Sequence, residues 1–218
     1  PGLKLDPTGR YAIYVADQDE YLKNELYSIP VAGGEPTKLN VELEEDDDVL
    51  ARFVRLTPDG KRVVYLVQRE DEGPVEVYSS NLTGGGIEAL HPIYGDEGTA
   101  AIEDFFITED SQHVVYRAVL DEDDTIALFA APIYGGNAVR LTPRETFGAV
   151  AHGGITALPD GKTILFLAED ETEKKLELYS VPVTGGTPEK LSGDFAGDGT
   201  VLHTSIRVSP DGSMVYYV

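Results

Sequence analysis

The sequence predicts an all-β fold made of repeated four-stranded antiparallel units, and three observations support this prediction. Two glycine-containing markers recur every 50 or 51 residues along the 218-residue chain. The segments between these markers are short runs rich in Val, Ile, Tyr and Phe, which suit half-buried pleated strands. No segment shows the apolar periodicity of an amphipathic helix.

The first marker is a tight turn of the Pro-Asp-Gly type. Its last residue recurs at spacings of 51, 51, 50 and 51, and an aromatic residue follows five positions later in every copy. Pro presets φ near about −65°, Asp bonds to local amides, and Gly accepts the positive φ that closes a hairpin. The turn positions are Gly9, Gly60, Ser111, Gly161 and Gly212, and the aromatic positions are Tyr14, Tyr65, Tyr116, Phe166 and Tyr217.

The second marker is a Gly-Gly pair, which recurs at 33–34, 84–85, 135–136 and 185–186. Two independent markers that stay in step over four copies indicate a repeat protein. We expect Gly-Gly to close a second hairpin in each copy, because Gly adopts the backbone angles that short hairpin loops require.

Each copy is predicted to contain four strands in a fixed order. The first strand precedes the Pro-Asp-Gly turn, the second follows it, the third precedes Gly-Gly, and a brief fourth follows Gly-Gly. The first strands are expected at 51–56, 102–107, 153–158 and 203–208, and the second at 11–15, 62–67, 113–119, 163–168 and 214–218. The third are expected at 25–31, 75–82, 126–133 and 176–183, and the fourth at segments such as 36–39 and 188–191.

Four-stranded antiparallel units of about 40 to 50 residues are typical of β-propeller blades. Neighbouring blades pack face to face, which explains apolar residues on both sides of the second strand. A β-sandwich would not require so regular a repeat. We therefore predict one propeller segment over 1–218, with repeats at approximately 1–50, 51–101, 102–151, 152–201 and a partial 202–218.

The repeats resemble those of TolB-like, or WD-like, bacterial β-propellers. The phrases that carry the resemblance are "YVADQDEYLKNELYSIPVAGGEPTKLN", "ELYSVPVTGGTPEKL" and "SPDGSMVYYV". Such repeats occur in the TolB periplasmic propeller, in the propellers of prolyl oligopeptidase and tricorn-type proteases, and in long bacterial surface or secreted proteins. The resemblance implies a fold and a periplasmic or extracellular setting, but no activity, because one fold hosts many functions.

The count of repeats is four plus the first hairpin of a fifth. We expect an excised piece of a longer array, or a half-ring that pairs with a second copy. Unpaired strand edges favour association, so a homodimer through the open blade edges is expected.

The composition excludes several classes of partner and site. A formal charge of −22 repels nucleic acid and anionic membranes, and no apolar run is long enough for membrane insertion. The chain has no cysteine, which excludes a disulfide framework and cysteine metal ligands. Such acidity is compatible with cationic partners, or with a surface that only keeps the protein soluble.

Catalytic motifs are not evident in the sequence. It contains no nucleophile elbow, no zinc-protease helix motif and no dinucleotide-binding glycine pattern. The segment 160–163 mimics the end of a P-loop, but a strand is expected after it, so we interpret it as a hairpin turn.

Two histidines are candidate ligand-binding residues. His152 and His203 each lie eight residues before the Asp of their turn, at the start of the strand that lines a propeller channel. With Asp198 and Asp194 they could form a metal or ligand site at the channel rim. The alternative is that they are ordinary polar rim residues.

Acidic loops precede the channel strand in several copies, at 42–48, 95–98 and 193–199. Hard cations such as Ca²⁺ favour these oxygen ligands, although no loop has the spacing of a calcium-binding loop. The candidate metal ligands are Asp46, Glu97, Asp194 and Asp198. A solvated charged rim is the alternative interpretation.

The sequence therefore favours a non-catalytic scaffold that binds a protein partner or small ligand at the propeller rim. Two alternatives remain open: an accessory or gating propeller of a larger peptidase of the prolyl oligopeptidase or tricorn type, and a propeller lyase or hydrolase with its own channel site.

Overall fold

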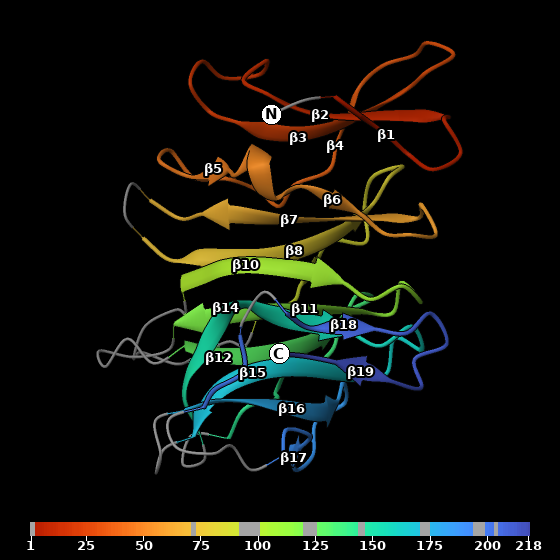
Figure 1. Cartoon of the computed structure of the whole chain (residues 1–218). Helices are drawn as coiled ribbons and strands as arrows, with labels where there is room; N and C mark the ends of the chain where they lie inside the picture. The colour runs from red at the N-terminus through yellow and green to blue at the C-terminus, as the bar shows by residue number, and fades with distance from the viewer. Residues whose placement is uncertain are drawn as a thin grey trace.

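The computed structural model describes residues 3–70, 73–91, 101–119, 126–143, 147–170, 175–193, 199–202 and 205–218. Within them the chain forms antiparallel sheets that follow one another in sequence order (Figure 1). We call the four large sheets blades 1 to 4. No helix in these ranges is long and apolar enough to cross a membrane.

Blades 1, 3 and 4 each contain four strands whose spatial order is their order in the chain. Blade 1 contains β1 (Lys4–Leu5), β2 (Tyr11–Ala16), β3 (Glu25–Pro30) and β4 (Thr37–Lys38). Blade 3 contains β10 (Ala101–Ile107), β11 (His113–Val119), β12 (Ile126–Pro132) and β13 (Val139–Arg140). Blade 4 contains β14 (Phe147–Ala157), β15 (Thr163–Asp170), β16 (Leu176–Pro182) and β17 (Glu189–Lys190). The terminal hairpin contains β18 (Arg207–Val208) and β19 (Val215–Tyr216).

Blade 2 departs from the predicted pattern at its first strand. It contains β5 (Asp48–Val49), η1 (Ala51–Phe53), β6 (Arg55–Leu56), β7 (Arg62–Gln68), β8 (Val75–Asn81) and β9 (Glu88–Ala89). The continuous strand expected at 51–56 is wrong, because the short 3₁₀ helix η1 interrupts it. Val49 and Val54 are both buried in the core between blades 1 and 2. In a straight strand residues five apart would point to opposite faces, so the turn lets both side chains reach one core.

The aromatic residue after the turn lies in the core in the three inner copies, whereas Tyr14 and Tyr217 are only partly buried. Tyr65, Tyr116 and Phe166 are almost fully buried, and each is paired across the sheet with an aromatic residue of the third strand. The four pairs are stacked with ring centroids 5.5 to 5.9 Å apart: Tyr14–Tyr27, Tyr65–Tyr78, Tyr116–Phe129 and Phe166–Tyr179.

The hydrophobic core is divided into layers, one between each pair of neighbouring blades. Along β7, Val63, Tyr65 and Val67 pack in the layer shared with blade 1. Val64 and Leu66 pack in the layer shared with blade 3. Successive residues of a strand point to opposite faces, so a strand buried on both faces must be apolar throughout. This confirms the face-to-face packing predicted from the second strands.

Hydrogen bonds between blades also follow the repeat. The Ser28 hydroxyl donates to the Leu82 carbonyl at 2.6 Å, and Ser79, at the same place one blade later, donates to the Ile133 carbonyl at 2.6 Å. The Tyr116 hydroxyl donates to the Leu90 carbonyl at 3.1 Å. These bonds satisfy buried polar groups and fix how one blade sits on the next.

The glycine markers are contact points between blades as well as turn residues. A Cβ on Gly60 would lie 2.9 Å from Cδ of Pro7 in the preceding turn, and one on Gly84 would lie 2.7 Å from Cγ2 of Thr37. Both glycines also have positive φ, 67° and 87°. Each marker is therefore required twice, for the turn itself and for the close approach of the neighbouring blade.

Candidate functional site

Most of the residues predicted to form a rim site lie outside the described residues. This holds for Glu97, Asp194, Asp198 and His203. The backbone of His152 belongs to β14, but its side chain is outside the described part of the chain. The structure therefore leaves the histidine site and most of the metal site as predictions.

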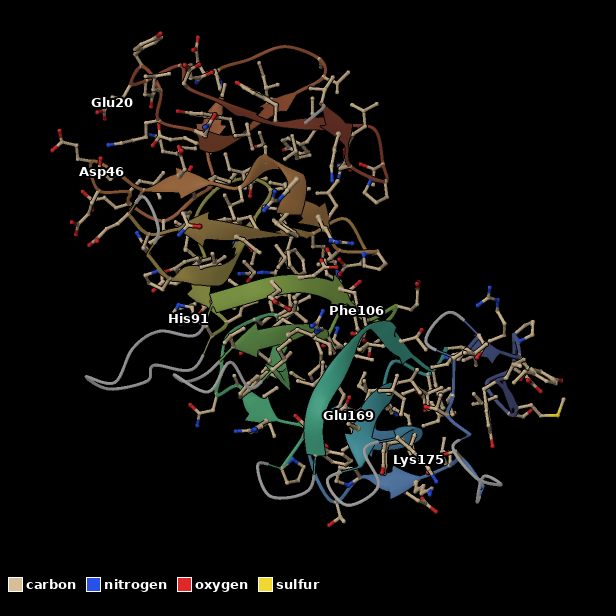
Figure 2. All side chains as sticks on the ribbon, turned by 60° about the vertical axis from the view of Figure 1, so that its left-hand side comes forward. Glu20, Asp46, His91, Phe106, Glu169 and Lys175 are labelled. Atoms are coloured by element: carbon tan, nitrogen blue, oxygen red, sulfur yellow. The ribbon has the colours of Figure 1, made fainter. Side chains whose placement is uncertain are left out.

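Asp46 is the one predicted metal ligand that is described, and it is exposed on the loop between β4 and β5. Figure 2 places it on the same side of the blades as Glu20. The adjacent Asp47 is buried and forms an ion pair with Arg69. Burial would raise the pKa of Asp47, but hydrogen bonds from the Glu44 amide and Arg69 hold it below its ordinary value. No group of three or more metal-ligating side chains is found among the described residues.

A different site lies between blades 3 and 4, in a cleft of about 450 Å³. The first strands β6, β10 and β14 supply much of its lining, with further residues from β11 and β12. Figure 2 shows Phe106, one of the lining residues, near the end of β10 beside β14. We call this hollow the Arg117 cleft.

Arg117 breaks the pattern of the repeat. It is the residue directly after the core aromatic of β11, and the same place in the other copies holds Val15, Leu66, Leu167 and Val218. Leu66 and Leu167 are fully buried core residues. Arg117 is buried as well, at 5% exposure, so an ionisable side chain occupies a position that the fold otherwise fills with an aliphatic one. Side chains of this kind are almost never fully buried without a partner.

The guanidinium of Arg117 is only partly paired. Its Nη2 lies 2.8 Å from Oε2 of Glu103, whose side chain is 38% exposed. Its Nε and Nη1 are buried and have no hydrogen-bond partner within the described structure. A buried donor without a partner costs about 1 to 3 kcal/mol. The buried guanidinium of Arg117 therefore lowers the stability of the fold, and it belongs to a residue that lines a concave surface.

A second arginine lines the same cleft from blade 2. The Nη2 of Arg55 donates to Oδ1 of Asp104 at 2.9 Å, and its guanidinium lies over the Phe105 ring at 5.1 Å. The Nε atom of Arg55 is buried without a hydrogen-bond partner among the described atoms. The ion pair joins β6 to β10, so two consecutive first strands hold this guanidinium in place.

The remainder of the lining is largely apolar. Partly buried side chains of Phe106, Ile155 and Ala157 pack against the core layer between blades 3 and 4 and also line the cleft. Binding pockets typically combine an apolar lining with a few placed polar groups. The Arg117 cleft has this composition, and the buried polar atoms of its lining that lack a hydrogen-bond partner are donors.

Sequence reasoning missed this site, although a usable signal was present. When the second strands are aligned on their aromatic residue, "HVVYRAV" differs from "RVVYLV" and "TILFLA" by a charge at one core position. A break of a local rule inside a regular repeat is expected at functional sites. The signal lay in the differences between copies rather than in their agreement.

Comparisons with known proteins give structural matches only. No protein-family model matches the chain, and no curated protein matches its sequence. Among solved structures, an oligogalacturonate lyase from Vibrio parahaemolyticus matches with a TM-score of 0.59 and 14% identity, over 98% of this chain and 56% of that one. A putative dipeptidyl aminopeptidase IV from Bacteroides ovatus matches with a TM-score of 0.56 and 15% identity, over 98% of this chain and 35% of that one. A putative TolB from Agrobacterium tumefaciens matches with a TM-score of 0.49 and 19% identity, over 98% of this chain and 73% of that one.

The predicted fold class is confirmed: the chain has an all-β fold of propeller type, built of antiparallel four-stranded blades. At these identities the likeness concerns the fold alone, and it does not transfer an activity. The chain spans about half the length of the matched lyase and about a third of the matched peptidase.

Proposed function

We propose that this chain is a non-catalytic β-propeller segment that binds a ligand or a segment of a protein partner in the Arg117 cleft. The cleft replaces the channel-rim histidines as the leading candidate site, because its side chains are described and their contacts are known. An exported setting, a homodimer through open edges and calcium at the acidic rim stay predictions from the sequence.

The observation that carries the proposal is the buried, partly paired guanidinium of Arg117. Other copies show that the fold accepts an aliphatic residue at this place, so packing does not require the charge. A ligand that accepts from Nε and Nη1 would satisfy both donors, and binding would then offset the cost of burying them.

The alternatives from the sequence differ in where activity would reside. An accessory propeller of a larger peptidase would act on substrates through a separate catalytic domain, and a propeller lyase would need chemistry in its own channel. Neither explains why blade 3 carries an arginine at a position where the other blades carry an aliphatic residue. The binding proposal accounts for that difference between copies.

A ligand screen followed by amide chemical shifts tests the proposal. The ¹⁵N-labelled chain would be mixed with a library of small ligands, and shifts would be mapped onto the sequence. We expect hits to perturb amides of 104–107, 115–117 and 155–157. Hits that cluster only at the acidic loop around Asp46, or a screen with no hit at the cleft, would contradict the proposal.

A matched pair of variants separates the cleft from general charge effects. Arg52 is exposed on η1 and does not line the cleft. R52L removes one positive charge without touching the site, whereas R117L removes the proposed donor. Cleft hits should survive in R52L and be lost in R117L.

A further inference from the structure

We infer that the ligand of the Arg117 cleft is an uncharged molecule that presents a carbonyl oxygen next to an apolar side chain. This inference rests on the proposed function, and it adds the chemical class of the ligand. A blocked apolar amino acid or a short apolar peptide segment has this chemistry.

Among the residues that line the cleft, the buried side-chain atoms without a hydrogen-bond partner are all donors. Nε and Nη1 of Arg117 and Nε of Arg55 are buried nitrogen atoms, and guanidinium groups cannot accept hydrogen bonds. A ligand must therefore bring acceptor oxygen atoms. A hydrogen bond from a charged donor to a carbonyl oxygen satisfies this requirement without adding another charge.

The charges around the cleft argue against an anionic ligand. Arg117 is already paired with Glu103 and Arg55 with Asp104, and the Glu109 carboxylate also lines the cleft. The two guanidinium charges are thus balanced by carboxylates before any ligand binds. The chain as a whole carries a formal charge of −22, which disfavours the approach of anions. The cleft needs an acceptor atom but not a negative charge.

The apolar lining specifies the rest of the ligand. Phe106, Ile155 and Ala157 are only partly buried in the present packing, so part of their surface is available to a ligand side chain. The volume of about 450 Å³ lies in the range of about 300 to 1,000 Å³ that small-molecule sites occupy. Burying a Leu-sized side chain should raise the affinity at least about tenfold, which makes such a side chain a major source of affinity.

Three related probes test the inference by NMR titration of the full chain. N-acetyl-leucine N-methylamide has two amide carbonyl groups and an apolar side chain. N-acetyl-leucine has a carboxylate in place of the N-methylamide, and N-acetylglycine N-methylamide lacks the side chain. We expect the uncharged leucine probe to bind with an affinity on the order of millimolar, as suits its size. The glycine probe should bind at least about tenfold more weakly, because it buries no side chain.

The carboxylate probe decides the charge of the ligand. If N-acetyl-leucine binds more tightly than the uncharged leucine probe, the ligand is an anion and the inference is wrong. Weaker binding of the carboxylate probe supports it. Measurement at low and high salt adds a second readout, since the affinity of an uncharged probe should not depend on screening.

Variants link binding to the proposed donor. R117L should lower the affinity for the uncharged leucine probe by about tenfold to a hundredfold, which corresponds to the loss of hydrogen bonds from a charged donor. R117M, with a longer unbranched side chain, provides a second test should R117L fail to fold. R52L should leave the affinity unchanged. Unchanged binding in both folded Arg117 variants would overturn the inference.

The titrations separate the inference from the proposed function. If the three probes leave the cleft amides unperturbed while another ligand of the screen perturbs them, the ligand class is wrong and the binding function stands. If no ligand perturbs those amides, the proposed function fails as well.

Discussion

Replacing Arg117 by leucine should stabilise the protein, although it removes an ion pair. Position 117 is a buried aliphatic position in two other blades, where Leu66 and Leu167 are fully buried. Natural proteins commonly keep an unfavourable residue at a functional site, and its removal then raises stability at the expense of function. R117L tests whether Arg117 is such a residue.

The magnitude follows from the contacts of the guanidinium. R117L removes two buried donors without partners, each costing about 1 to 3 kcal/mol. It also removes a pair with Glu103, and a pair with so exposed a carboxylate is worth about 0 to 1 kcal/mol. Leucine is shorter than arginine, so some packing is lost beside the cleft. We expect a net gain of about 1 to 3 kcal/mol in the free energy of unfolding, in the range found when buried ionic groups are replaced by apolar ones.

The assay is urea and thermal unfolding of wild type and R117L under the same conditions. A chain of this length gains about 2 to 4 °C in midpoint temperature for each kcal/mol. Because repeat arrays need not unfold in one step, fluorescence and circular dichroism should be compared before free energies are derived.

Arg62 provides a matched control, because it is buried like Arg117 but each of its three guanidinium nitrogen atoms has a hydrogen-bond partner. Its nitrogen atoms donate to Oγ of Ser79, to Oδ1 of Asn81 at 2.9 Å and to the Gly86 carbonyl. R62L leaves these acceptors without a donor and should destabilise the protein by about 2 to 3 kcal/mol. If R117L also lowers the free energy of unfolding by more than about 1 kcal/mol, Arg117 is a structural residue and the reasoning behind the binding site is refuted.

Three further predictions concern the repeat itself. Ser80 is fully buried with no partner for its hydroxyl in the described structure, and the other copies have Ile29, Ala131 and Val181 at this position. S80V should therefore raise the free energy of unfolding in urea by about 1 kcal/mol, and a lower stability of S80V would mean that the hydroxyl is paired. Gly9 and Gly60 have nearly the same φ, 68° and 67°, but of these two only Gly60 lies close to the preceding turn. G60A should therefore lower the free energy of unfolding by at least about 1 kcal/mol more than G9A, and equal effects of the two substitutions would exclude the contact between turns. Burial would raise the pKa of Asp6, but hydrogen bonds from the Thr8 hydroxyl and the Tyr11 and Thr8 amides hold it at about 2. The folded pKa is thus below the unfolded value. The ionised carboxylate therefore contributes to the free energy of unfolding above about pH 4, and this contribution is lost as the pH falls through about 2. The stability difference between wild type and D6N should therefore shrink over this range in unfolding experiments at pH 6, 4, 3 and 2, and a constant difference would show that the carboxylate is not the source.

The repeat could be read from the sequence because its causes are local and recur. Turn residues fix hairpins within a few positions, and apolar alternation fixes which face of each strand is buried. Both signals recur in every copy, so the order of the strands and the position of the aromatic residue after each turn could be predicted. The pairing of that residue with an aromatic residue of the third strand was seen only in the structure. The interruption of the first strand of blade 2 by η1 could not be predicted, because it depends on the tertiary packing that places Val49 and Val54 in the same core layer.

The sequence by itself determined a chain of four-stranded blades with turns at fixed spacing. The rim site that it predicts at His152, His203 and Asp198 stays a prediction, whereas the Arg117 cleft could be found only in the structure. Whether a charged residue is a solvated surface group or a buried donor depends on what the neighbouring blade places against it. Arg117 and Arg55 are 62 positions apart, and only the packing of blades 2, 3 and 4 brings them to one cleft. That juxtaposition is decided by the stacking of sheets, since strand patterns specify which faces are buried and not which atoms remain without partners.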